Sequence, residues 1–238
     1  MASVANMFRF KHFSIDDSLS AMKIGTDGVL LGAWADVVGC DTILDAGTGT
    51  GLIALMAAQR NAKSHIVAVD IVSDAAAEAR SNADMSPWSE RIEVMCSDLR
   101  KFSYGAKFDH IISNPPFFSD AVLPPNVARS VARHTTTLKF EDIVVAAERL
   151  LRVGGRLSLI LPVECGPRMR SAAFGHLWLS RQTEVITRQG EPPKRLLMEF
   201  TLQAEPLMPR CDELTIQDEN GAYMMKYRQM TEEFYLMF

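Results

Sequence analysis

An asparagine followed by two prolines and two aromatic residues is the segment of this sequence with the clearest chemical potential. The segment Ser113-Asn114-Pro115-Pro116-Phe117-Phe118 follows an apolar run at 108–112, which predicts a buried parallel strand. Because the prolines end any ladder or helix, the asparagine amide is expected at the carboxyl end of a central strand. Ligands of open α/β sheets bind at that edge.

The chemistry available to this turn is the capture of a planar amino group. The side-chain carbonyl of Asn114 and the main-chain carbonyl of Pro115 can accept both of its hydrogens, and the ring of Phe117 can stack on the flat group that carries it. Held in this way, the nitrogen is supported as it turns pyramidal and attacks a carbon electrophile. The alternative is a Pro-Pro turn with a capping asparagine and two core aromatics. An electrophile supplied by the same chain would favour the first interpretation.

A glycine-rich turn provides a place for that electrophile. Asp45-Ala46-Gly47-Thr48-Gly49-Thr50-Gly51 joins an expected strand at 42–46 to an expected helix at 52–60, and its glycines let the backbone approach a ligand closely. The spacing G-x-G-x-G differs from the dinucleotide-binding G-x-G-x-x-G. The acidic residue before the glycines disfavours a pyrophosphate and suits a cationic ligand that carries an ammonium group.

Two further aspartates follow expected strands. Asp70 ends the strand at 65–69, about twenty residues beyond the glycines, where an acidic side chain can bind two ribose hydroxyls. Asp98 follows the strand at 91–95 and is a candidate acceptor for the amine of an adenine ring. Either one alone is compatible with an ordinary turn aspartate; their order favours a nucleoside-containing cofactor.

The N-terminal segment and a long loop contribute candidates of lower specificity. Thr26 or Asp27 can cap a helix at 29–35, whose N-terminus, with Lys23, can meet an anionic group of a cofactor. Arg9 and Lys11 alternate with phenylalanines, which suits contact with nucleic acid as well as a short edge strand. The irregular stretch 119–137 contains Arg133 and His134, which can order the Asn-Pro-Pro turn, meet a phosphate or simply be solvated.

Length, charge and composition limit the classes of protein to which this chain can belong. The chain has 238 residues and a formal charge of −4, which suits one α/β domain and argues against a strongly basic nucleic-acid coat. We expect no membrane span, no signal peptide and no metal site, and reduced thiols in a cytoplasmic protein. A single domain is expected over 1–238, with an N-terminal extension at 1–40 that contributes to the cofactor site and to contact with nucleic acid.

The second half completes the expected sheet. A helix at 138–151 closed by Gly154-Gly155, a strand at 156–161 and a helix at 164–174 precede two long strand-like segments, 178–187 and 195–203. The last two are expected to pair in antiparallel fashion at the sheet edge. Residues 206–238 are interpreted as an irregular tail packed on the domain.

Taken together, these motifs resemble those of the class I S-adenosylmethionine-dependent methyltransferases. The Asn-Pro-Pro-aromatic sequence is similar to the motif that distinguishes the amino-methylating branch of that class. A closer resemblance, to the bacterial tRNA adenine-N6 methyltransferases, covers nearly the whole chain. It rests on the segments at 8–13, 21–28, 30–34, 132–134 and 231–236. One departure is Phe117, where many relatives in the wider branch carry tyrosine; no step should then depend on a phenol hydroxyl.

The resemblance implies a fold, a cofactor and a role for each residue. The fold is a Rossmann-like, mostly parallel sheet of seven strands with an antiparallel last strand and helices on both faces. S-adenosylmethionine would be held by Lys23, Thr26, Asp27, Asp45, Gly47, Gly49, Gly51, Asp70 and Asp98. Catalysis would involve Asn114, Pro115 and Phe117, and tRNA would contact Pro116, Phe118, Arg9, Lys11, Arg133 and His134. The target would be the adenosine 3′ of the anticodon in valine tRNA.

Three alternatives stay open from sequence. A protein glutamine-N5 methyltransferase shares the motif because a glutamine amide is also a planar NH2, but such enzymes usually carry a longer N-terminal domain. An adenine-N6 enzyme acting on rRNA or DNA is the second alternative. The third is an inactive cofactor-binding RNA assembly factor, which the intact Asn-Pro-Pro-Phe disfavours. The sequence leaves the oligomeric state open and favours a monomer.

Overall fold

The structure, a computed structural model, describes residues 7–18, 23–116 and 138–238. Its strands are β1 (Met7–Arg9), β2 (Ser14–Asp16), β3 (Thr42–Ala46), β4 (His65–Asp70), β5 (Ile92–Cys96), β6 (Phe108–Ser113), β7 (Leu151–Pro162), β8 (Trp178–Arg188), β9 (Arg195–Thr201) and β10 (Arg210–Gln217). Its helices are α1 (Thr26–Trp34), α2 (Leu52–Arg60), α3 (Ser73–Asp84), α5 (Phe140–Leu150), α6 (Gly166–Ala173) and α7 (Met225–Thr231), with short 3-10 turns η2 (Ser89–Arg91) and η3 (Val163–Cys165).

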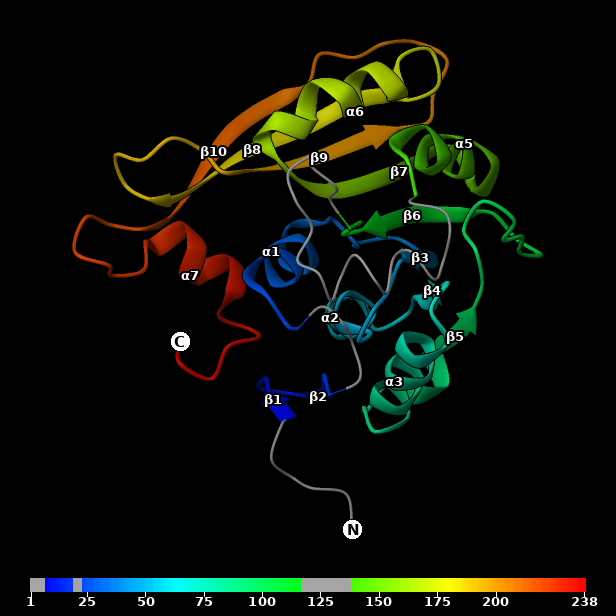
Figure 1. Cartoon of the computed structure of the whole chain (residues 1–238), viewed down its shortest axis with the longest axis horizontal. Coiled ribbons are helices and arrows are strands. Elements are labelled where there is room, and N and C mark those ends of the chain that lie inside the picture. The colour runs from blue at the N-terminus through cyan, green and yellow to red at the C-terminus, as the bar shows by residue number, and fades with distance from the viewer. Residues whose placement is uncertain (1–6, 19–22, 117–137) are drawn as a thin grey trace, which may run out of the picture.

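An eight-stranded sheet in the order β10-β8-β9-β7-β6-β3-β4-β5 forms the centre of the molecule (Figure 1). The pairings β6–β3, β3–β4, β4–β5 and β6–β7 are parallel. β9 is antiparallel to both β7 and β8. The expected Rossmann-like fold class and the expected antiparallel pair are therefore confirmed.

The β10 edge of the sheet differs from the expectation. The sheet has one strand more than the expected seven, because β10 pairs in parallel with β8 and covers the edge that was assigned to the antiparallel pair. Part of the expected irregular tail is therefore regular. In β10 only Leu214 and Ile216 are buried, so its sequence carries a short and weak alternation, and the strand depends on its partner for stability.

Two other expected boundaries, the end of one helix and the start of another, differ from those in the structure. Gly154 and Gly155 do not close the helix but lie inside β7, which starts at Leu151 directly after α5. The irregular pairing between Phe108 and His110 of β6 absorbs these extra residues. At the start of α1, the N-cap is Gly25 rather than Thr26 or Asp27.

Helices cover both faces of the sheet. α1, α2 and α7 lie on one side, and α5 and α6 lie on the other (Figure 1). The strands alternate accordingly: Ile43 and Ile66 belong to the core beneath α1 and α2, whereas Leu44 and Val67 belong to the core beneath α5. Burial on both faces explains the nearly continuous apolar runs of the parallel strands.

Glycines bring α1 and α2 close together. A Cβ on Gly28 would lie 2.9 Å from Leu52 Cδ2, and one on Gly32 would lie 2.6 Å from Met56 Sδ. These close approaches bring the N-terminus of α1 beside the first residue of α2, directly after the glycine-rich turn.

Candidate active site

Asn114 lies immediately after β6, as predicted. The side chain is half-buried, and Pro115 is buried next to it while Pro116 is exposed. The Oδ1 atom of Asn114 is buried and has no hydrogen-bond partner among the described residues. Since an unpaired buried acceptor costs roughly 1–3 kcal/mol, this atom is suited to a donor that arrives with a ligand.

The glycine-rich turn has the backbone that only glycine adopts readily. Gly47, Gly49 and Gly51 have φ of 75°, 56° and 85°, all in the left-handed region. A Cβ built on Gly47 or Gly49 would meet nothing within 4 Å. The surface of this turn is therefore open to an approaching group, and the turn is anchored from behind by Gly47 N and Thr48 N, which donate to Val69 O at 2.8 and 3.0 Å.

Asp45 is a fully buried acid beneath this turn. Its Oδ2 accepts from Thr48 Oγ1 at 2.6 Å and from Ala54 N at 3.0 Å, whereas Oδ1 is buried without a partner in the described part of the chain. Burial raises the pKa of Asp45 to about 7, because a carboxylate loses its hydration there. A cationic group near Oδ1 would lower that pKa again and stabilise the carboxylate.

The turn and Asn114 are on neighbouring strands. In the parallel pairing of β3 and β6, Asp45 lies opposite Ile112, and Ser113 Oγ donates to Ala46 O at 2.7 Å across the two strand ends. Adjacent strands are about 4.8 Å apart. Two unpartnered buried oxygens therefore lie near the same edge of the sheet, on either side of this hydrogen bond.

Asp70 lies at the end of β4, as expected, and its carboxylate binds the glycine turn. Its Oδ2 accepts from Gly49 N at 2.9 Å and its Oδ1 accepts from Val72 N at 2.9 Å. Each carboxylate oxygen has a second lone pair, so these bonds orient the carboxylate and leave acceptor capacity for two hydroxyls.

Asp98 has a partner that the sequence interpretation did not assign. Arg100 donates to both of its oxygens, with Nε–Oδ1 at 2.8 Å and a terminal nitrogen at 2.6 Å from Oδ2. These hydrogen bonds hold the pKa of Asp98 below its ordinary value. The carboxylate is therefore ionised and fixed in orientation. The only indication of this ion pair in the sequence is that Arg100 follows Asp98 by two residues.

The turn before α1 contributes charged groups beside the site. Asp27 is paired with Arg195, with Nε and Oδ2 2.8 Å apart, and Lys23 is paired with Asp17 at 3.7 Å. Thr26, the first residue of α1, is exposed. The contact of Gly28 with Leu52 brings this turn near the glycine loop.

Asn82 is a positioning residue that the sequence interpretation missed. It is fully buried on α3. Its Nδ2 donates to Thr50 O at 2.9 Å and to Asp16 O at 2.8 Å, and its Oδ1 accepts from Asp16 N at 2.9 Å. One side chain thus joins the glycine turn to the N-terminal hairpin. An asparagine inside an otherwise alanine-rich helix was its only signal.

The proposed RNA contacts are only partly described. Arg9 in β1 and Lys11 after it are exposed. Phe117, Phe118, Arg133 and His134 lie outside the described residues. The described ranges contain no group of three or more His, Cys, Asp or Glu that could hold a metal ion, and no helix within them is long and apolar enough to cross a membrane.

The site fits S-adenosylmethionine. The open surface of Gly47 and Gly49 is a cradle that any Cβ would narrow, the unpartnered Oδ1 of Asp45 suits an ammonium group, and Asp70 retains capacity for hydroxyls. A cationic amino acid joined to a nucleoside combines those groups.

Comparison with known proteins agrees with this chemistry. Residues 26–183 match the methyltransferase small domain family. The chain is 46% identical to a tRNA1(Val) (adenine(37)-N6)-methyltransferase of Phocaeicola vulgatus, covering 96% of this chain and 97% of the relative. It is 44% identical to the enzyme of the same name from Pasteurella multocida, over the full length of both.

Solved structures share the fold. A predicted O-methyltransferase from Agrobacterium tumefaciens superposes with a TM-score of 0.70 at 23% identity, over 87% of this chain and 96% of that one. The 16S rRNA N2 G1207 methyltransferase of T. thermophilus, solved with AdoMet and guanosine, gives 0.56 at 18% identity, over 83% of this chain and 50% of that one. The protein is an S-adenosylmethionine-dependent methyltransferase, and it belongs to the tRNA1(Val) (adenine(37)-N6)-methyltransferase family within the methyltransferase small domain group.

Proposed function

We propose that this protein methylates the exocyclic N6 of adenosine 37 in tRNA1(Val). The full-length similarity to relatives of that name supports the substrate. The observation that carries the chemistry is the buried Oδ1 of Asn114, which has no partner among the described residues and lies at the strand end beside the glycine turn. An acceptor of this kind is what an incoming amino group requires.

The cofactor side of the site is assigned to the acidic strand ends. When bound, S-adenosylmethionine supplies a methyl group on a positively charged sulfur, so the electrophile is already activated. Asp45 would accept from the ammonium group of the methionine part, with Lys23, Thr26 and Asp27 nearby. Asp70 would accept from the ribose hydroxyls, and Asp98, held by Arg100, would accept from the adenine amine. Gly47, Gly49 and Gly51 leave room for the cofactor.

The catalytic role falls to Asn114 and Pro115. Their two carbonyl oxygens would accept the N6 hydrogens and direct the lone pair toward the methyl carbon, so that catalysis consists mainly of positioning. As positive charge develops on nitrogen, both oxygens stabilise it without reorganising. The burial of Pro115 and of Asn114 Oδ1 supports this role because the hydrogen bonds are stronger away from water.

An anticodon loop is a suitable substrate for such a site. Loop bases unstack at lower cost than paired bases, and stacking on an aromatic ring, roughly 1–3 kcal/mol, offsets part of that cost. Phe117 is proposed for this stacking, and Pro116 and Phe118 for contact with the same base. Arg9, Lys11, Arg133 and His134 are proposed to meet the RNA. A tRNA substrate would place the enzyme in the cytoplasm.

The test compares two asparagine variants. Asn114→Ala is expected to lower methyl transfer to tRNA by at least 100-fold while the Kd for S-adenosylmethionine changes less than threefold. Asn220→Ala, at an exposed turn after β10, is the matched control and should retain wild-type turnover. Labelled methyl groups are followed into tRNA, rRNA, DNA and protein, and the tRNA is digested to nucleosides.

Each outcome of this experiment is informative. N6-methyladenosine at position 37 of tRNA1(Val) supports the proposal. Label in protein, rRNA or DNA instead of tRNA would refute the substrate, and near-normal turnover by Asn114→Ala would refute the catalytic role.

A further inference from the structure

A pocket lies on the side of the sheet that carries α1, apart from the buried oxygens of Asp45 and Asn114. Its volume is about 480 Å³, and it is lined by parts of β1, α1, β8, β9, β10, α7 and the C-terminal segment. Neither Asp45, the glycines of the turn nor Asn114 lines it. The groups proposed to react therefore do not form this pocket, although Thr26 and Asp27, proposed to lie near the cofactor, border it.

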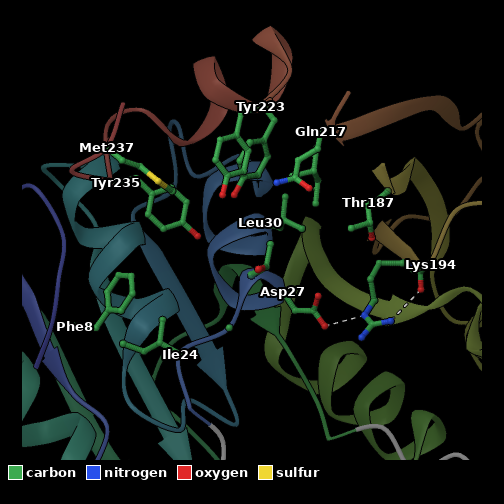
Figure 2. A pocket seen from close by; sticks show the side chains of 16 residues that line it. Phe8, Ile24, Asp27, Leu30, Thr187, Lys194, Gln217, Tyr223, Tyr235 and Met237 are labelled. Atoms are coloured by element: carbon green, nitrogen blue, oxygen red, sulfur yellow. Dashed lines mark hydrogen bonds and ion pairs between the residues drawn. The ribbon is translucent and has the colours of Figure 1, made fainter. Parts of the chain in front are cut away.

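Aromatic rings form one wall of this pocket. Phe8, Tyr223 and Tyr235 line it, and Figure 2 shows the hydroxyl ends of the labelled Tyr223 and Tyr235 directed toward its middle. Tyr223 is 37% exposed. Its ring stacks on Tyr227 with centroids 5.4 Å apart and meets Phe238 in an edge contact with centroids 5.1 Å apart. A ring that is rigid and still accessible is a platform for another planar group.

Cations form the opposite wall. Lys194 and Arg195 line the pocket, and the labelled Lys194 lies across the pocket from the labelled Tyr235 (Figure 2). Lys194 Nζ is 2.8 Å from Glu191 Oε2, and its side chain is 54% exposed. Arg195 donates through Nε to Asp27 and through one terminal nitrogen to the carbonyl of Lys194. Because a guanidinium has five donors, these bonds fix its plane and leave capacity for a phosphate.

The pocket and Asn114 share one edge of the sheet. Arg195 pairs with Pro162 at the end of β7, and β7 is the neighbour of β6. Gln217, which also lines the pocket, ends β10. With strands about 4.8 Å apart, the pocket starts roughly 10 Å from Asn114 and extends to roughly 20 Å. A few nucleotides of single-stranded RNA can span that distance.

We propose that this pocket binds a second, unstacked nucleotide of the RNA substrate, a few positions from the methylated adenosine. Its base stacks on Tyr223, and its phosphate lies against Lys194 and Arg195. Stacking on aromatic rings combined with backbone cations is how proteins hold single-stranded loops. This inference rests on the proposed function, because it extends the same RNA beyond the reacting base.

The cofactor is the alternative occupant, because Asp27 borders the pocket and is also proposed to lie near the methionine part. The geometry favours RNA. Asp27 is already occupied by Arg195, and a wall of aromatic rings with two cations suits a base with its phosphate better than a cationic sulfonium. If RNA occupies the pocket, substitutions in its wall should weaken the binding of RNA. If the cofactor occupies it, they should weaken the binding of S-adenosylmethionine.

The experiment uses the full chain and the anticodon stem-loop of tRNA1(Val). Binding is measured by fluorescence anisotropy of the labelled stem-loop, and KM and kcat are measured for methyl transfer. Tyr223→Ala is expected to raise the Kd and KM for RNA about tenfold, within the range that base–aromatic stacking supports, with kcat and the KM for S-adenosylmethionine unchanged. Tyr223→Phe, which keeps the ring, is the matched control and should behave as wild type.

A second variant tests the phosphate contact. Lys194→Gln removes an exposed charge and is expected to lower the slope of log Kd against log salt by about 0.7, the contribution of one phosphate on a single strand. Thermal melts of both variants report whether the fold is retained.

The outcomes separate this inference from the proposed function. Unchanged RNA affinity in Tyr223→Ala, an equal loss in Tyr223→Phe, or a raised KM for S-adenosylmethionine alone would overturn the nucleotide pocket. An unchanged salt slope in Lys194→Gln would overturn the phosphate contact. If the wild-type protein transfers no methyl group to tRNA, the proposed function fails, and the anisotropy measurement still decides whether the pocket binds RNA.

Discussion

Asp45 offers a direct test of how burial and cofactor binding oppose each other. Asp45→Asn keeps the size of the side chain, and its amide oxygen can accept from Thr48 Oγ1 and Ala54 N as Oδ2 does. What the substitution removes is the negative charge. In the absence of cofactor, that charge is buried, and its Oδ1 atom has no hydrogen-bond partner in the part of the chain that the structure describes.

The sign and size of the effect follow from the pKa. Burial raises the pKa of Asp45 from 3.8 to about 7, so the folded state binds a proton that the unfolded state has released. The stability from this neutral acid is complete below the unfolded pKa and is lost as pH rises toward the folded pKa. Between pH 5 and the folded pKa lie about two units, each worth roughly 1.4 kcal/mol. The wild type should therefore lose roughly 3 kcal/mol relative to Asp45→Asn between pH 5 and pH 8.

The assay is urea unfolding of both proteins without cofactor, followed by circular dichroism at pH 5, 6, 7 and 8. Asp45→Asn should be the more stable protein at pH 8, and the difference between the two free energies of unfolding should grow with pH. Parallel pH profiles would refute the reasoning, because they would mean that Asp45 is ionised in the folded protein at pH 5.

The same variant should lose function as it gains stability. The ammonium group proposed to face Oδ1 favours the carboxylate, so the wild type should release a proton when it binds S-adenosylmethionine at pH 6. Asp45→Asn should bind the cofactor at least tenfold more weakly and release no proton, since removing one partner of a buried charge pair costs roughly 2–5 kcal/mol. Calorimetry in buffers of different ionisation enthalpy measures both quantities, and equal affinities would contradict the assignment.

Two further predictions concern glycines. Gly49→Ala and its matched control Gly39→Ala both introduce a Cβ at positive φ, 56° and 73°, with no atom within 4 Å, so each should lower the free energy of unfolding by about 1–2 kcal/mol. Only Gly49→Ala should raise the Kd for S-adenosylmethionine; an equal Kd in both would exclude the glycine turn as a cofactor cradle. Gly32→Ala would place a Cβ 2.6 Å from Met56 Sδ and 3.2 Å from Met56 Cβ, and overpacking of this kind should cost about 1–3 kcal/mol in urea unfolding. A loss below about 0.5 kcal/mol would show that Met56 repacks freely.

The sequence by itself determined the local elements that carry the site. The strand at 42–46 and the helix at 52–60 coincide with β3 and α2, and β6 ends where the Asn-Pro-Pro segment begins. These boundaries depend on neighbouring residues: a continuous apolar run for a strand buried on both faces, and glycine or proline at its end. The sequence also predicted that the glycine turn and Asn114 share one edge of the sheet, because parallel strands end on the same side of a sheet.

Only the tertiary structure decided the contacts between distant segments. Asp27 and Arg195 are 168 residues apart, and Asn82 of α3 binds Asp16 of β2 and Thr50 of the glycine-rich turn. β10 became a strand because β8 offers it an edge, although its own sequence alternates weakly. Periodicity reports which face of an element is buried but not which element covers it, since pairing energy depends on the partner and its register. The contacts of the polar side chains around the glycine turn therefore depend on the tertiary structure, whereas the strand ends depend on local sequence.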